Sequence, residues 1–119
     1  MKTLPLTKSI RDFRGRPMNQ QSGEVGGNGA PIMIPMLIKD IYLHYLGVYT
    51  SQNGKQVIAA YKFGIAIVDC KDPEMEIENA DFLLLKEATQ KPMHGALVMG
   101  QVYEELDRVG KEPEKKKEK

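Results

Sequence analysis

The chain has 119 residues, one cysteine, no tryptophan and a formal net charge of +1 at pH 7. A chain of this length predicts one domain that buries roughly two-thirds of its unfolded surface, so it needs neither a disulfide nor a structural metal. Cys70 has no internal disulfide partner, which favours a reducing compartment. No apolar run approaches the roughly 20 residues of a membrane helix, and the N-terminus does not resemble a signal peptide. We therefore expect a soluble, cytoplasmic protein that makes no use of a membrane.

The near-zero net charge conceals an uneven distribution along the chain. Residues 1–30 carry a net charge of +3, residues 31–107 carry −5, and residues 108–119 carry +3. An acidic body argues against a nucleic-acid-binding face on the folded domain. It leaves open a contact with nucleic acid through the basic ends.

Residues 1–18 predict an N-terminal arm or a small β-hairpin. Leu4 and Leu6 alternate with polar neighbours, and Gly15 favours a tight turn with a positive φ. Residues 19–30 contain four glycines and almost nothing to bury, so we expect a flexible glycine-rich loop. Ile32 and Ile34 follow this loop and could pair with the N-terminal strand.

Two amphipathic helices are expected over residues 35–49 and 56–69. In the first, Pro35 suits the first helical position, and the apolar stripe is Leu37, Ile38, Ile41, Tyr42, Tyr45 and Val48. In the second, one side carries Val57, Ala60, Tyr61, Gly64, Ile67 and Val68. The short polar connection between them favours an antiparallel αα-hairpin.

The remaining sequence predicts a short strand and two further helices. Residues 74–78 alternate strictly between acidic and apolar side chains, as in a strand, and Asn79 is a reasonable N-cap for a helix over residues 79–89. A fourth helix is expected over residues 94–109, stopped by Gly110, and residues 110–119 form a charged tail that we expect to be disordered. The predicted fold is therefore mainly α: a compact bundle of about four helices within residues 31–109, with a small N-terminal hairpin or arm.

Residues that could carry chemistry are few. The acidic segment from Asp69 to Asp81 does not fit an EF-hand, whose twelfth position would here be Ala80. His44, His94 and Cys70 lack the spacing of a metal site, and no paired acid and base is visible. We expect no catalytic residues, no metal and no cofactor, and hence no enzyme.

Two sets of side chains remain as candidates for binding. A basic set could contact phosphates, and it comprises Arg11, Arg14, Arg16, Lys115, Lys116 and Lys117. A second set consists of methionines, which fill irregular gaps in cores and also form adaptable partner surfaces: Met33, Met36, Met93 and Met99. Both roles stay open for these methionines, and we treat them as the candidate interaction surface.

Three stretches resemble a loose family of small, mostly uncharacterised proteins of tailed phages and prophages. They are residues 6–17 (LTKSIRDFRGRP), 76–86 (EIENADFLLLK) and 98–107 (VMGQVYEELD). The resemblance contributes no functional residues, and the insertion at 19–30 and the lysine tail depart from it. It implies a viral setting in an infected bacterial cell and a role in virion or tail assembly.

These observations favour a non-enzymatic phage protein that binds another protein or itself. The alternative is a small phage regulator that binds nucleic acid through its basic ends. Affinity of that kind would fall steeply with salt, because each phosphate contact releases a counterion.

Overall fold

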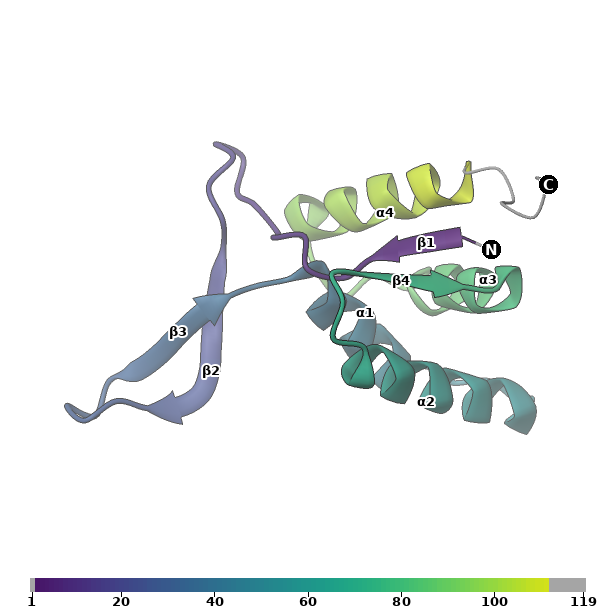
Figure 1. The fold of residues 1–119 in the computed structure, drawn as a ribbon, viewed down its shortest axis with the longest axis horizontal. Coiled ribbons are helices and arrows are strands. Elements are labelled where there is room, and N and C mark those ends of the chain that lie inside the picture. Colours follow the sequence, from purple (N-terminus) through teal and green to yellow (C-terminus); the bar gives the residue numbers. More distant parts are fainter. Residues whose placement is uncertain (1, 112–119) are drawn as a thin grey trace.

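The structure is a computed structural model that describes residues 2–111. Within them, the elements follow in the order β1 (Lys2–Pro5), β2 (Asn19–Val25), β3 (Pro31–Pro35), α1 (Ile38–Gly47), α2 (Gly54–Asp69), β4 (Glu74–Ile77), α3 (Asn79–Ala88) and α4 (Ala96–Gly110). They form a body of helices around a short sheet, from which a hairpin projects (Figure 1).

The sheet of the body joins two segments that lie far apart in the sequence. β1 pairs antiparallel with β4, with Leu4 opposite Met75 and Lys2 opposite Ile77. Its burial alternates, so that Leu4 is fully buried while its neighbours are only partly covered. In Figure 1 this pair runs through the middle of the body, with α4 on one side and α1 and α2 on the other.

The core draws on every helix and on both strands of this sheet. Its fully buried side chains include Tyr42 and Tyr45 of α1, Leu85 of α3 and Val102 of α4. Helix α1 starts where the Asp40 carboxylate accepts a hydrogen bond of 3.0 Å from the Leu37 N–H. Helix α2 is capped by Asn53, whose side-chain oxygen accepts from the Lys55 N–H at 3.0 Å.

The second sheet is the β2–β3 hairpin. Its register places Gln20 opposite Ile34, and it is interrupted between Gln21 and Val25, where Gly23 has a φ of +92°. The hairpin extends away from the body (Figure 1), and the molecule measures 55 × 33 × 28 Å. The radius of gyration is 15.6 Å, against about 13.5 Å expected for a compact chain of this length. From here on we call residues 19–35 the arm; it is a different segment from the N-terminal arm predicted over residues 1–18.

The prediction of a mainly helical fold is wrong. The structure is an α/β fold, 46% helical and 22% strand, with two small antiparallel sheets in the described residues. The expected loop at 19–30 contains β2, and the first helix begins at Ile38 because residues 31–35 form β3. Ile32 and Ile34 belong to the strand that pairs with β2, not to a partner of the N-terminal strand. The polar sequence of β2 carries no hydrophobic alternation because both of its faces are open to solvent, so the strand gave no pattern to detect.

The local predictions fared better. The αα-hairpin, the short strand after it and the two later helices are confirmed, with ends that differ by at most three residues. Gly15 has the expected positive φ of +83° in a turn where the Asp12 N–H donates to the Arg16 carbonyl at 2.8 Å. The helix-stopping Gly110 is the last residue of α4. Of the expected tail, residues 112–119 lie outside the described residues.

Candidate functional site

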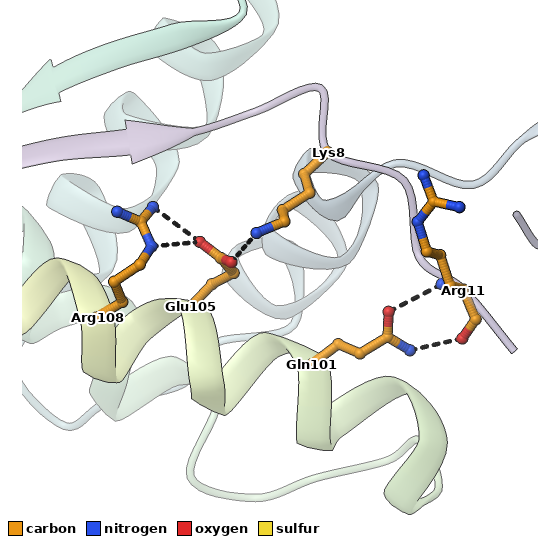
Figure 2. A network of polar contacts seen from close by, with 5 residues as sticks. All are labelled: Lys8, Arg11, Gln101, Glu105 and Arg108. Atoms are coloured by element: carbon orange, nitrogen blue, oxygen red, sulfur yellow. Dashed lines mark hydrogen bonds and ion pairs between the residues drawn. The ribbon is translucent and has the colours of Figure 1, made fainter. Parts of the chain in front are cut away.

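A polar network fixes the N-terminal segment to α4 (Figure 2). The Glu105 side chain accepts hydrogen bonds from Lys8 and, at 2.8 and 3.1 Å, from the guanidinium of Arg108. One turn earlier in α4, the Gln101 amide accepts from the Arg11 N–H at 2.8 Å and donates to the Arg11 carbonyl at 2.7 Å. The segment that leads into the arm is thereby held at two points.

Glu105 is almost fully buried, at 8% exposure. Burial by itself would raise the pKa of Glu105, but the hydrogen bonds and charges of Lys8 and Arg108 outweigh it, so that the pKa lies below its ordinary value. The carboxylate is therefore ionised at neutral pH and forms ion pairs with the Lys8 and Arg108 side chains. In this arrangement the Glu105 carboxylate ties the N-terminal segment to α4.

The base of the arm is fixed by a closed set of backbone hydrogen bonds. The Ile10 N–H donates to the Met36 carbonyl, the Met36 N–H donates to Met18, and the Met18 N–H donates to Ile10, over 2.8–2.9 Å. The Gln20 amide also donates to the Asp40 carboxylate of α1 at 2.8 Å. The arm therefore leaves the body in a set direction.

The arm is nearly uncharged and exposes several apolar side chains. Its exposed large apolar side chains are Val25, Ile32, Met33 and Ile34, which are between 39% and 66% accessible. Glu24 is the one charged residue among residues 19–35. Within residues 2–111, β2 and β3 form a sheet of two strands with no third strand beside it. An isolated two-stranded sheet is at best marginally stable, and open strand edges are ready sites for pairing with another chain.

A second apolar surface lies along α1 and α2. A groove of about 480 Å³ runs between these helices, lined among others by Leu43, Tyr49, Tyr61 and Gly64. On α2 the exposed side chains beside it are Val57, Ile58, Tyr61, Ile65 and Val68, with exposures from 39% to 68%. We call these five residues the α2 face.

The sequence analysis did not predict that the α2 face would be exposed. Val57, Tyr61 and Val68 were expected on the covered side of the helix, but the side chains that α2 buries are Ala60, Phe63 and Ile67. The available signal was that Ile58, Phe63 and Ile65 fall outside the expected stripe. A helix that is apolar around most of its circumference has more than one face to cover.

The two candidate histidines contact each other, and the thiol of Cys70 contacts other groups. His44 and His94 stack edge to face with ring centroids 5.3 Å apart, while the Cys70 thiol lies against the carbonyls of Asp72 and Glu74 at the end of α2. No group of three or more metal-binding side chains comes together in the part of the chain that the structure describes.

The four candidate methionines occupy different places. Met33 is 51% exposed on the arm, Met93 is 57% exposed in the connection before α4, and Met36 is partly buried at the base of the arm. Met99 is 3% exposed in the core, where its sulfur lies 3.3 Å from the Tyr45 hydroxyl. The structure thus leaves Met33 and Met93 accessible to a partner and places Met99 in a packing role.

The three candidate arginines are exposed on the turn beside the arm. Arg11 donates to the Gly15 carbonyl at 2.7 Å, and Arg16 pairs with Asp12 at 3.3 Å. The backbone hydrogen bond from Arg16 is the main cause that holds the pKa of Asp12 below its ordinary value; desolvation opposes it, and the backbone hydrogen bond from Arg14 adds to it. The turn therefore keeps an acidic group among its basic side chains. Lys115, Lys116 and Lys117 lie outside the described residues.

Comparison of the chain with protein-family models, with curated proteins and with solved structures gave no match. Among the helices described, none is both long and apolar enough to cross a membrane. The arm and the α2 face carry most of the exposed large apolar side chains among the described residues.

Proposed function

We propose that the protein is a non-enzymatic phage protein that binds another protein through the arm during virion or tail assembly in an infected bacterial cell. The observation that carries the proposal is a fixed, nearly uncharged hairpin that leaves its apolar side chains exposed. The viral setting rests on the sequence resemblance alone.

The exposed part of the arm's apolar side chains does not stabilise the isolated protein, whereas fully burying a Val, Ile or Met side chain contributes about 1.5–3 kcal/mol. The network around Glu105 and the bonds at Ile10, Met18 and Met36 hold the arm in place beforehand. A partner then meets an ordered surface, which reduces the entropy lost on binding. The partner that fits this surface is a protein with an open strand edge or an apolar groove.

The test is a pull-down from phage-infected cells with the wild-type protein and the variant Met33→Lys/Ile34→Lys. We expect the variant to lose the retained partner while its circular dichroism and unfolding midpoint stay unchanged, because both side chains are exposed. Leu83→Lys is the matched control, since Leu83 is 54% exposed on α3. A wild-type protein that retains no partner, or a variant that retains it fully, contradicts the proposal.

A second candidate is the regulator that binds nucleic acid through its basic ends. It is favoured by the clustering of Arg11, Arg14 and Arg16 on one exposed turn. Reversing the charge of Arg14 should weaken binding to a short DNA duplex and reduce its salt dependence by about one phosphate contact. Unchanged binding across salt concentrations excludes this function.

A further inference from the structure

The α2 face is a helix surface that the body leaves uncovered. Helix α2 buries Ala60, Phe63 and Ile67 against the core, yet Tyr61 and Val68 remain 68% and 58% exposed on another side. Its apolar positions 57, 61, 65 and 68 recur at steps of three and four residues. They form a stripe along nearly the whole helix, as in helices that pack against another helix.

The charges of α2 are placed against its own dipole. The helix has three charged residues, and they are spaced seven apart: Lys55, Lys62 and Asp69. Lys55 lies in the first turn and Asp69 is the last residue, whereas a helix dipole favours acids at the start and bases at the end. The isolated helix thus carries an unfavourable charge order that an oppositely directed helix would correct.

From this complementarity we propose that the α2 face packs against the α2 face of a second copy of this chain, antiparallel about a two-fold axis. The proposal deepens the proposed function by naming a second partner, and it rests on it only in assuming an interaction protein. Two αα-hairpins joined in this way form a four-helix arrangement.

The spacing determines which residues meet. Positions seven apart lie on one flank of a helix, and in an antiparallel pair that flank faces the same flank of the other helix in reverse order. Lys55 therefore faces Asp69 of the partner subunit, and the two-fold axis makes this ion pair twice. In the same register Val57 comes within one residue of the level of Val68 of the partner subunit, and these apolar side chains continue the seam beside the charges.

One contact in this register is unfavourable. Lys62 lies midway between Lys55 and Asp69 and faces its own copy across the axis. Its long side chain can direct the ammonium group into solvent, which limits the repulsion. Removing this charge should therefore strengthen the dimer.

The size of the surface limits the affinity. A helix of 16 residues is about 24 Å long. With the α1 side chains that line the adjoining groove included, the contact surface is two packed helices or about 18 Å wide, which gives roughly 430 Å² of footprint per copy. Stable complexes bury about 1,200–2,000 Å² in total, so this dimer falls in the weak class, with an expected Kd of tens of micromolar or more.

The experiment is sedimentation equilibrium of the full chain from about 10 to 500 µM, the range in which weak interfaces of this size associate. We expect reversible dimerisation of the wild type. Ile65→Lys should weaken it at least tenfold, while Leu83→Lys leaves it unchanged. Lys62→Gln should tighten it by about twofold to fivefold, because one like-charge contact disappears.

The decisive experiment exchanges the charges at the two ends of α2. Lys55→Glu alone and Asp69→Lys alone should each weaken the dimer at least threefold, because each creates two like-charge contacts. The double variant Lys55→Glu/Asp69→Lys should return the Kd to within about threefold of the wild type. Both single substitutions improve the match to the helix dipole, so loss of dimer cannot be ascribed to loss of the fold.

A wild type that stays monomeric at all concentrations overturns this inference, as does a double variant no better than the singles. If Ile65→Lys instead abolishes capture of another protein by a monomeric wild type, the α2 face belongs to that protein. The two proposals separate cleanly, because Met33→Lys/Ile34→Lys should abolish the partner of the arm and leave the dimer intact. A lost dimer with an intact arm partner refutes only the pairing of α2.

Discussion

Replacing either of two tyrosines of α1 by phenylalanine should have different effects on the free energy of unfolding. Tyr42 and Tyr45 lie three residues apart and are both fully buried. The Tyr42 hydroxyl has no hydrogen-bond partner among residues 2–111. The Tyr45 hydroxyl accepts from the N–H groups of Met93 and His94, at 2.7 and 3.2 Å, and lies 2.9 Å from the His94 ring. Replacing each by phenylalanine removes one oxygen from two very different settings.

The magnitudes follow from what each oxygen leaves behind. Tyr45→Phe leaves two backbone N–H groups without an acceptor, and each such group costs about 1–3 kcal/mol when buried. Because Met93 and His94 are partly exposed, each group should cost an amount near the low end of that range. We therefore expect the free energy of unfolding to fall by about 2–3 kcal/mol in total. Tyr42→Phe removes a polar atom that is already without a partner. Its stability should therefore stay equal or rise by up to about 1 kcal/mol.

Urea unfolding at pH 7 measures both effects. With an m-value near 1.5 kcal/mol/M for a domain of this size, a difference of about 3 kcal/mol separates the two midpoints by roughly 2 M. Burial raises the pKa of Tyr42, so its hydroxyl stays neutral at this pH and the comparison involves no change of charge. Midpoints that fall together, or a loss above about 1 kcal/mol for Tyr42→Phe, would refute the assignment of partners.

Two further predictions concern α4. Glu105→Gln should lower the free energy of unfolding by about 1–2 kcal/mol at pH 7, whereas the exposed Glu104→Gln should change it little. Because the folded pKa of Glu105 lies below its ordinary value of 4.5, its contribution to stability is full above that pH and is lost as the pH falls through the folded pKa. The difference in urea midpoint between the wild type and Glu105→Gln should therefore be smaller at pH 3 than at pH 7. A difference that stays constant contradicts the ion pairs. Gly100→Ala should raise the stability by about 0.5–1 kcal/mol, since its Cβ would meet open space. Gly110→Ala should lower it by about 1–2 kcal/mol, since its Cβ would lie 2.8 Å from the Phe82 ring, and melting temperatures that move in the same direction exclude this reasoning.

The candidate site could be predicted only in part. Met33 was identified from its residue type, and Ile32 and Ile34 beside it were expected to pair with the N-terminal strand. Their actual partner β2 was missed, because its glycine-rich and glutamine-rich sequence looks like a loop. The apolar content of α2 was visible as well. Which of its sides would be covered depends on where α1 and the core are placed, and no local pattern contains that information.

The sequence by itself determined the four helices and the tight turn at Gly15, because helical periodicity and backbone preference act within a few residues. Only the tertiary structure decided that Leu4 pairs with Met75, that the arm extends into solvent and that the α2 face stays open. The paired strands β1 and β4 lie about seventy residues apart in the sequence. Which strands pair depends on the free energy of the whole folded chain, and no local pattern determines it.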